Sequence, residues 1–354
     1  MTIRERIEQT ERETLSPYAA LSAQSRGRRF PQSPCPVRTV YQRDRDRIIH
    51  LCRAFRRLAY KTQVFFSPAS DHLRTRLSHT LEVSQIARTI AKALRLNDDL
   101  TEAIALAHDV GHTPFGHAGE HALDKAYRRH DPNAHFNHAE HSLRVVDELE
   151  RDGSGLNLTA ETREGILLHS KGRADTRGTL HRPPGATLEA LVVRLSDRIA
   201  YVNHDLDDCL RSGVVMQEEI PEEVLNEIGR HHSARVGRMV EDVINCSLDS
   251  PQLAMSEDVT AAMDGLKDYL YDHVYLSELL QAEAAKVEGI IGQLFDVYMN
   301  SDTILHEAIQ LVPTDGKTRA RLVCDYIAGM TDRFARDQYV RHFLPSGYPP
   351  VEDH

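Results

Sequence analysis

The sequence predicts an all-α protein, a helical bundle with an additional C-terminal helical layer. The chain has no Trp and an aromatic share of 6%, and Ala, Leu, Arg and Glu are abundant, which favours helices over sheet. Apolar residues also recur at steps of three and four along much of the chain, as they do on one face of a helix. With 354 residues and 41% hydrophobic content, the chain can bury a large core.

The first segment, residues 1–40, is predicted as an N-terminal arm. It contains a short charged helix from Ile3 to Glu13, followed by a stretch rich in Ser, Pro and Arg, and we expect it to be disordered or to lie on a neighbouring subunit. Residues 1–61 hold 14 Lys and Arg against 6 Asp and Glu, although the whole chain has a net charge of −10. Such a basic segment suits a phosphorylated ligand or nucleic acid, and charge pairing between subunits is an equal alternative.

The next elements lead to the first candidate ligand. Residues 44–58 have the apolar spacing of a helix, and residues 61–66 have the β-branched and aromatic content of a short strand or hairpin arm. A long helix follows from Arg74, with apolar residues at three- and four-residue steps to Leu94. His79 lies four residues before Val83, so we expect it on the buried stripe of this helix. A buried histidine needs partners for both ring nitrogens, either a metal and an acceptor or two hydrogen bonds.

Residues 108–120 combine three histidines and two carboxylates with three glycines and a proline. We expect His108 and Asp109 in the last turn of a buried helix that Gly111 and Pro114 bring to an end. An imidazole beside a carboxylate suits Zn, Fe, Mn or Mg, whereas a lone His-Asp pair is more often a core histidine beside a helix cap. Ten of the 20 histidines fall between residues 72 and 141, which favours the metal site.

Further helices are expected over residues 137–151 and 161–169, and residues 170–185 read as a loop, either a lid over a polyphosphate or a solvated connection. The helix expected over residues 187–211 carries Asp197, Tyr201 and Asp205 at successive four-residue steps between apolar flanks. Two carboxylates and a tyrosine on a mostly buried helix are costly unless they are paired. Beyond residue 217 we expect a helical layer, with helices over residues 236–243, 269–280, 284–298 and 318–334.

Composition excludes several classes of protein. No apolar run approaches the roughly 20 residues that span a bilayer, and the first residues lack a signal-peptide core, so we expect a soluble cytoplasmic protein. The five cysteines have no Cys-x-x-Cys spacing, which argues against a disulfide framework and against a thiolate zinc site. We expect them to be reduced packing residues.

The buried candidates His79, His108, Asp109 and Asp197 predict a site for one divalent ion, with positions left open for water and a phosphate oxygen. Their spacing resembles that of the HD superfamily of metal-dependent phosphohydrolases. Nearly the whole chain resembles the bacterial deoxyguanosinetriphosphate triphosphohydrolase-like proteins. The stretches that carry this resemblance are residues 42–50, 74–83, 108–120, 136–144, 196–201 and 325–333.

The resemblance implies an HD-domain fold and the hydrolysis of a deoxynucleoside triphosphate to the deoxynucleoside and inorganic triphosphate. It implies one divalent ion (Mn, Mg or Fe) on the four ligands, and a homo-oligomer. The implied general acid and base pair is His117 and Glu120, with His112 and His138 as further polar contacts to the phosphates. The implied substrate contacts are Arg76 and Arg198 to phosphate oxygens, Tyr201 and Asp205 to the sugar, and Gln63 to the 3′-hydroxyl. Many relatives read His-Asn-Glu-Gln-Ser where this chain has His-Ala-Glu-His-Ser at residues 138–142.

Two other functions compete with this one. Another HD phosphohydrolase, acting on a nucleoside monophosphate, a cyclic nucleotide or a guanosine pyrophosphate, would share the metal site. A catalytically silent nucleotide sensor or DNA-binding oligomer would use the same pocket, and single-stranded DNA at the basic N-terminal segment could also regulate an active enzyme. For the chain as a whole we expect an N-terminal arm (1–40), a phosphohydrolase core (41–215) and a C-terminal helical region (216–354).

Overall fold

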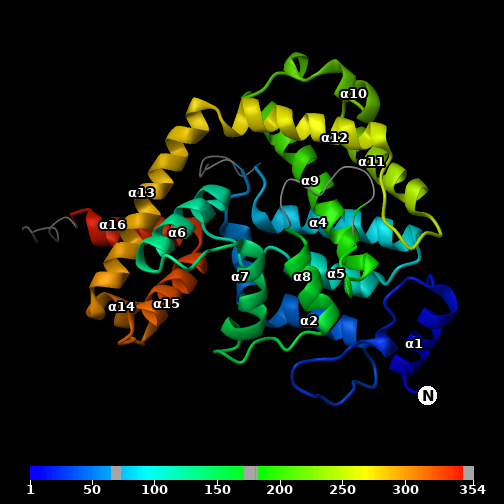
Figure 1. Cartoon of the computed structure of the whole chain (residues 1–354), viewed down its shortest axis with the longest axis horizontal. Helices are drawn as coiled ribbons and strands as arrows, with labels where there is room; N and C mark the ends of the chain where they lie inside the picture. The colour runs from blue at the N-terminus through cyan, green and yellow to red at the C-terminus, as the bar shows by residue number, and fades with distance from the viewer. Residues whose placement is uncertain (65–72, 171–179, 181, 346–354) are drawn as a thin grey trace, which may run out of the picture.

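The computed structural model describes residues 1–64, 73–170, 180 and 182–345, and within these the chain is helical (Figure 1). The described residues form no strand, which confirms the all-α prediction, and only two isolated β-bridges, Arg28–Thr159 and Thr62–Thr75. The α-helices are α1 (Ile3–Thr14), α2 (Val40–Leu51), α3 (Arg53–Arg57), α4 (Arg76–Ala93), α5 (Asp98–Ala107), α6 (Gly116–His130), α7 (His138–Arg144), α8 (Ala160–Leu168), α9 (Leu188–Ser212), α10 (Glu222–Ile228), α11 (His232–Ser247), α12 (Glu257–Leu270), α13 (Glu278–Asn300), α14 (Asp302–Ile309), α15 (Gly316–Ala328) and α16 (Asp332–Phe343). Short 3-10 or π segments are η1 (Ser22–Gln24), η2 (Leu58–Tyr60), η3 (Val145–Leu149), η4 (Gln217–Glu219) and η5 (Tyr271–Tyr275).

Helices α4 and α9 pack against each other in the middle of the molecule, with α5 against both (Figure 1). The expected apolar stripe of α4 is buried, including Val83, Ile86 and Ile90. Helix α9 begins at the Thr187 cap and ends at Gly213, whose φ of 71° is the left-handed conformation expected of a glycine after a helix. These helices therefore hold their polar residues in fixed positions beside an apolar core.

The C-terminal helices cover this centre in two groups. Helices α11 and α12 pack on α9, whereas α13 and α15 pack on α6 and enclose a separate apolar cluster that includes Phe115, Leu123 and Phe295. In Figure 1, α13 runs from the top of the molecule down beside α6, with α14, α15 and α16 around its lower part. The expected C-terminal helical layer is therefore present, and it reaches the segment that follows α5.

The N-terminal arm packs on its own chain, contrary to the expectation of disorder or of a position on a neighbouring subunit. The backbone N–H of Ala20 donates to Glu189 Oε1 at 2.9 Å, and Arg26 donates to Glu164 at 2.6 and 2.7 Å. Arg28 forms a buried ion pair with Asp44. The arm is held because its cations find carboxylates within the same chain, so part of its positive charge is neutralised internally.

Several elements differ from the predicted boundaries. The helix expected over residues 44–58 is broken at Cys52, whose extended backbone separates α2 from α3. Residues 61–64 form one bridge rather than a strand, and residues 65 and 66 lie outside the described part. Residues 269–280 span the end of α12, η5 and the start of α13, and the helix expected over 318–334 ends at Ala328 before α16 begins. Hydrophobic spacing continues through the three helix breaks because residues on both sides of each break pack into the same apolar cluster.

No helix in the described residues is long and apolar enough to cross a membrane. All five cysteines are free, and three of them, Cys52, Cys209 and Cys324, are buried. Those three are the packing residues that the sequence predicts, whereas Cys246 is exposed.

Candidate active site

The four predicted metal ligands come together from three helices. His79 lies on α4, His108 and Asp109 directly follow α5, and Asp197 lies on α9. His79 Nε2 is 3.1 Å from Asp197 Oδ1 and 3.9 Å from Asp109 Oδ2, and His108 Nε2 is 3.8 Å from the same two oxygens. His79, His108 and Asp109 lie close enough together to hold a metal ion, and Asp197 Oδ1 lies 3.1 and 3.8 Å from the two imidazole Nε2 atoms, so the four together suit one divalent cation.

The histidines of this group present their Nε2 atoms to the site because their Nδ1 atoms are engaged elsewhere. His108 Nδ1 is 2.7 Å from the carbonyl oxygen of Ala105, one turn earlier. A neutral imidazole has one N–H and one lone pair, so donation from Nδ1 leaves the lone pair on Nε2. His108 Nε2 is buried and has no hydrogen-bond partner among the described residues. A cation at this point would satisfy it, so the residues present fit a divalent ion.

His79 is oriented by a longer chain of contacts that the sequence pattern did not reveal. Its Nδ1 is 2.7 Å from His204 Nε2, and His204 Nδ1 lies 2.7 Å from Asp205 Oδ1. The Tyr275 hydroxyl donates to the other oxygen of Asp205. A carboxylate beside His204 Nδ1 favours a proton there, so His204 Nε2 can accept from His79 Nδ1. His79 Nε2 then keeps its lone pair for the site.

His169 is a further member of the site that sequence reasoning missed. Like His108 after α5, it directly follows a helix, α8, and its Nδ1 is 2.6 Å from the carbonyl oxygen of Ile166, three residues earlier. Its Nε2 is buried, lies 3.9 Å from Asp109 Oδ1 and has no hydrogen-bond partner among the described residues. Burial and the neighbouring His108 and His138 lower the pKa of His169 to about 3. The sequence could have identified His169 by its position, because it is a histidine at the buried end of a second apolar helix.

Asp109 is held ionised by its surroundings. Burial disfavours the charged carboxylate, but Arg76 and the nearby histidines outweigh this and hold the pKa of Asp109 well below its ordinary range. Arg76 Nη1 donates to Asp109 Oδ2 at 2.7 Å, and both side chains are 3% exposed. The Nη2 atom of Arg76 has no partner within the described residues, so it remains available to an anion.

The glycines of residues 108–120 allow close backbone packing. A Cβ atom on Gly111 would lie 2.1 Å from the Ser142 backbone nitrogen, and one on Gly119 would lie 1.8 Å from the Pro114 carbonyl oxygen. Side chains at these positions would push α7 and the start of α6 away. Helix α5 already ends at Ala107, so Gly111 serves this contact rather than ending the helix, and His108 and Asp109 lie just beyond the last turn in which we expected them.

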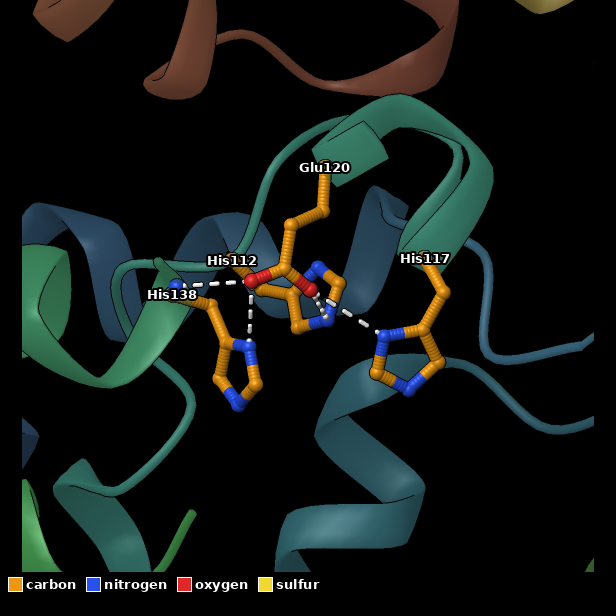
Figure 2. A group of neighbouring side chains, drawn as sticks. All are labelled: His112, His117, Glu120 and His138. Carbon is orange, nitrogen blue, oxygen red and sulfur yellow. Dashed lines mark hydrogen bonds and ion pairs between the residues drawn. The ribbon is translucent and has the colours of Figure 1, made fainter. Parts of the chain in front are cut away.

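A second group of predicted residues, His112, His117, Glu120 and His138, lies around one carboxylate (Figure 2). His138 Nδ1 is 2.7 Å from Glu120 Oε1, and His117 Nδ1 is 3.2 Å from Glu120 Oε2. His112 Nε2 is 4.0 Å from Glu120 Oε2. His117 and Glu120 come from the first turn of α6 and His138 from the first residue of α7, so the bend between these helices brings them together.

The members of this group have different pKa values. Burial raises the pKa of Glu120, but hydrogen bonds from His117 and His138 outweigh it and hold this carboxylate well below its ordinary pKa. Burial lowers the pKa of His138, but Glu120 outweighs burial and the net pKa is raised. Burial and Arg76 keep the pKa of His112 well below its ordinary value. Glu120 therefore favours the protonated form of His138, whereas burial and Arg76 favour the neutral form of His112.

A cavity of about 270 Å³ connects the two groups. Its lining includes His79, Asp109 and Asp197 from the first group and His117 and His138 from the second. Its cationic lining comprises Arg76, Arg194, Arg198 and Lys267. Four cations around two carboxylates give the cavity a charge that suits a polyanion.

The predicted substrate contacts lie in different positions. Gln63, Arg76, Arg198 and Tyr201 line the cavity, and Arg198 also forms an ion pair with Asp264. Asp205 does not line it; this carboxylate is 1% exposed and contacts His204 and Tyr275. His141 is also absent from the lining, and its Nδ1 lies 3.7 Å from Asp325 Oδ1 on α15.

The segment that carries His112 and His117 is fixed by the C-terminal helices. Lys61 Nζ donates to the carbonyl oxygens of His112 and Ala328, the latter at 2.8 Å. Asp332 accepts from the backbone N–H groups of Phe115 and Thr62, each at 2.8 Å. Phe115 has a positive φ of 62°, a conformation that side chains rarely adopt and that the surrounding contacts must hold. The C-terminal layer therefore positions this group.

Comparison with known proteins agrees with this geometry. The HD domain family matches residues 76–202, which include all four proposed ligands, and the phosphohydrolase-associated domain family matches residues 253–341. Among curated proteins, a deoxyguanosinetriphosphate triphosphohydrolase-like protein of Caldanaerobacter subterraneus subsp. tengcongensis is 49% identical, over 98% of this chain and 97% of its own. Its counterpart from Desulfatibacillum aliphaticivorans is 48% identical over 98% and 99%, and that of Clostridium tetani is 40% identical over 98% and 97%. A solved structure of a hypothetical protein from Aquifex aeolicus is similar with a TM-score of 0.41 and 20% identity, over 85% of this chain and 71% of that one.

Proposed function

This chain belongs to the deoxyguanosinetriphosphate triphosphohydrolase-like family of HD phosphohydrolases, and from this premise we propose a reaction. We propose that the protein hydrolyses deoxynucleoside triphosphates to the deoxynucleoside and inorganic triphosphate. One observation supports this proposal above the others. His79, Asp109 and Asp197 line the same cavity as His117 and His138 of the second group and four cationic side chains. These residues would provide an ion site, a proton-transfer group and a polyanion site next to one another.

His79, His108, Asp109 and Asp197 would hold the divalent ion, and Mn, Mg or Fe suits this donor set. When bound, the ion supplies Lewis-acid stabilisation of the α-phosphate and lowers the pKa of water. His108 and His79 reach it through Nε2 because their Nδ1 atoms are engaged by Ala105 and His204. The protein thereby fixes which nitrogen of each ring carries the proton.

The polar side chains of the cavity would bind and orient the substrate. Arg76 offers an unpartnered Nη2 to a phosphate oxygen while its Nη1 holds Asp109, and Arg198 would bind a second phosphate oxygen. Tyr201 and Gln63 would contact the sugar. The 2′ side of the sugar would face the apolar and aromatic part of the lining, where a hydroxyl would lose its hydration.

His117, Glu120, His112 and His138 would move the proton to the departing 5′ oxygen. Glu120 holds a proton on Nδ1 of His138 and on Nδ1 of His117, and His117 lines the cavity where the leaving oxygen would lie. Glu120 raises the pKa of His138 against the effect of burial, so His138 would be the group that replaces the proton that His117 gives up. Glu120 then orients both imidazoles, as a carboxylate does in other proton-transfer chains.

The direct test is a product assay on metal-stripped protein that has been reloaded with Mn, Mg or Fe. We expect triphosphate release from at least one of the four deoxynucleoside triphosphates, and complete loss of release and of bound ion in Asp109→Ala. Asp258→Ala, which removes an exposed carboxylate on α12, is the matched control and should behave as the wild type. Release of pyrophosphate or monophosphate would identify a different HD phosphohydrolase, and a metal-loaded protein that releases no product would identify a nucleotide sensor.

A further inference from the structure

The group of His112, His117, Glu120 and His138 has the composition of a metal site in its own right. It shares no residue with the quartet proposed for the first ion, and it offers three imidazoles and one carboxylate. At the usual Zn–N and Zn–O bond lengths of about 2.0–2.2 Å, the four ligand atoms of a tetrahedral site lie about 3.4 Å apart. The donors of this group lie 2.7, 3.2 and 4.0 Å from the oxygens of Glu120, and all four fall within 4.8 Å of one another.

His112 supplies the second observation. Its side chain is fully buried, and neither of its ring nitrogens has a hydrogen-bond partner among the described residues. Leaving both polar atoms of a buried imidazole unpaired is unfavourable, because each loses its hydrogen bonds to water without replacement. Figure 2 shows its ring beside the Glu120 carboxylate, with Nε2 on the side of the group. A cation bound beside Glu120 would be close to this nitrogen, which lies 4.0 Å from Glu120 Oε2.

The group also has an entry path. The side chain of His117 is 67% exposed and lines the cavity, whereas Glu120 is 16% exposed and His138 is 11% exposed. A cation that arrives through the cavity can reach the exposed imidazole of His117 before the less exposed carboxylate of Glu120. Nitrogen donors with one carboxylate favour Zn²⁺ over Mg²⁺, since Mg²⁺ prefers oxygen ligands.

We propose that His112, His117, Glu120 and His138 form a second cation site that binds Zn²⁺ independently of the quartet around Asp109. An ion at this site displaces to solvent the protons on Nδ1 of His117 and His138, and it occupies the nitrogens and the carboxylate that would otherwise carry the proton to the leaving group. Zinc bound here therefore inhibits hydrolysis while the first ion stays in place. This consequence rests on the proposed function, whereas the binding itself does not.

The test counts zinc ions on the intact protein and measures their affinities by titration against a competing chelator. We expect two ions per chain on the wild type. In His117→Ala the weaker of the two should lose about a hundredfold or more in affinity, because even the loss of an outer partner of a metal ligand costs about 10–100-fold. The matched control is His121→Ala, which removes an exposed histidine four residues after His117 on α6. This variant should retain both ions.

Each alternative result identifies a different arrangement. A single zinc ion on the wild type, or two ions of unchanged affinity in His117→Ala, would overturn the second site. Loss of the second ion in His169→Gln but not in His117→Ala would place it beside Asp109 and would also overturn the proposal. Because His117 is exposed, its replacement should leave the melting temperature unchanged, and His117→Gln provides a second variant with a similar volume.

Zinc inhibition is the functional readout. Adding Zn²⁺ to protein preloaded with the ion of the first site should slow triphosphate release, and a chelator at a concentration that spares the first ion should restore it. If no deoxynucleoside triphosphate is hydrolysed under any condition, the proposed function fails while the zinc count still decides the second site. If hydrolysis occurs but the zinc count stays at one, only the second site fails.

Discussion

The two histidine-carboxylate groups of the cavity differ in what their Nδ1 atoms contact. Around Asp109, the Nδ1 atoms of His108 and His169 lie against backbone carbonyl oxygens, which leaves their Nε2 lone pairs directed at the site. Around Glu120, the Nδ1 atoms of His117 and His138 lie against the carboxylate itself. In the first arrangement the Nε2 atoms are free to bind a cation. In the second, a proton lies in the hydrogen bond between each Nδ1 atom and a Glu120 oxygen.

Residue type alone therefore does not distinguish a group that presents free nitrogen donors from one whose imidazoles share protons with a carboxylate, whereas the partner of each ring does. A backbone carbonyl cannot give up or take a proton near neutral pH, so His108 is held in one tautomer. A carboxylate can exchange the proton with the imidazole, so His138 can change state. This difference predicts that substitutions in the two groups should separate ion binding from catalysis.

The largest separation is expected for Glu120→Gln. Without the carboxylate, His138 and His117 lose the charge that holds their protons, so kcat should fall about 10²–10⁴-fold, the range of general acid-base catalysis. The ion at the first site should be retained, because Glu120 is not one of its ligands. Steady-state kinetics and metal analysis on the same preparation provide the two readouts.

A matched control for this variant is Glu140→Gln. Glu140 also pairs with a histidine, His135, at 2.8 Å, but both side chains are more than half exposed and neither lines the cavity. Its replacement should leave kcat within twofold of the wild type. An equal loss of kcat in both variants, or loss of the first ion in Glu120→Gln, would contradict the separate roles of the two groups.

A smaller effect on the opposite property is expected for His204→Ala. This change removes the acceptor of His79 Nδ1, so the ring loses its orientation and the affinity for the first ion should fall about 10–100-fold, as for other outer partners of metal ligands. At saturating metal, kcat should recover. Metal titration followed by kinetics at saturation measures both quantities.

The chain offers two comparisons for that result. His204→Gln, which retains an acceptor at a similar distance, should restore part of the affinity, and His273→Ala, which removes an exposed histidine from η5, should have no effect. If kcat stayed low at saturating metal in His204→Ala, the contact to His79 would serve catalysis rather than ion binding.

The smallest expected effect concerns Lys61, which joins the group around Glu120 to the C-terminal helices. Burial lowers the pKa of Lys61 to about 7, whereas an unfolded lysine keeps its proton to about pH 10.4. Between these values the unfolded chain binds more protons, so the free energy of unfolding rises with pH. From pH 7 to pH 9 this group should add roughly 2 kcal/mol, which Lys61→Met should lack.

Urea unfolding of the wild type and Lys61→Met at both pH values measures this difference. The neutral amine can still donate to the His112 and Ala328 carbonyls, so the contact itself should survive at pH 9. Arg341→Met, a change at an exposed cation on α16, should give the same pH dependence as the wild type. The same pH dependence in Lys61→Met as in the wild type would show that Lys61 stays charged in the folded protein.

The sequence by itself determined the fold class, the position of His79 on a buried helix face and the candidate ligands His108, Asp109 and Asp197. These follow from helical periodicity and from motif spacing, which are local properties of the chain. The family resemblance pointed to His112, His117, Glu120 and His138, although it did not show that the three histidines surround the Glu120 carboxylate. The boundaries of several helices and the packing of the N-terminal arm were not determined in this way.

Only the tertiary structure decided which nitrogen of each histidine faces the cavity, and which residues form hydrogen bonds that orient the proposed ligands. His204 and Tyr275 act on His79 and Asp205, and His169 joins Asp109 from another helix, through contacts that no local pattern encodes. The burial of Lys61 was also decided by the tertiary structure. A charged residue is expected at the surface, but Lys61 is 2% exposed. A histidine tautomer and a lysine pKa depend on burial and on partners that are remote in sequence, and folding alone brings those partners together.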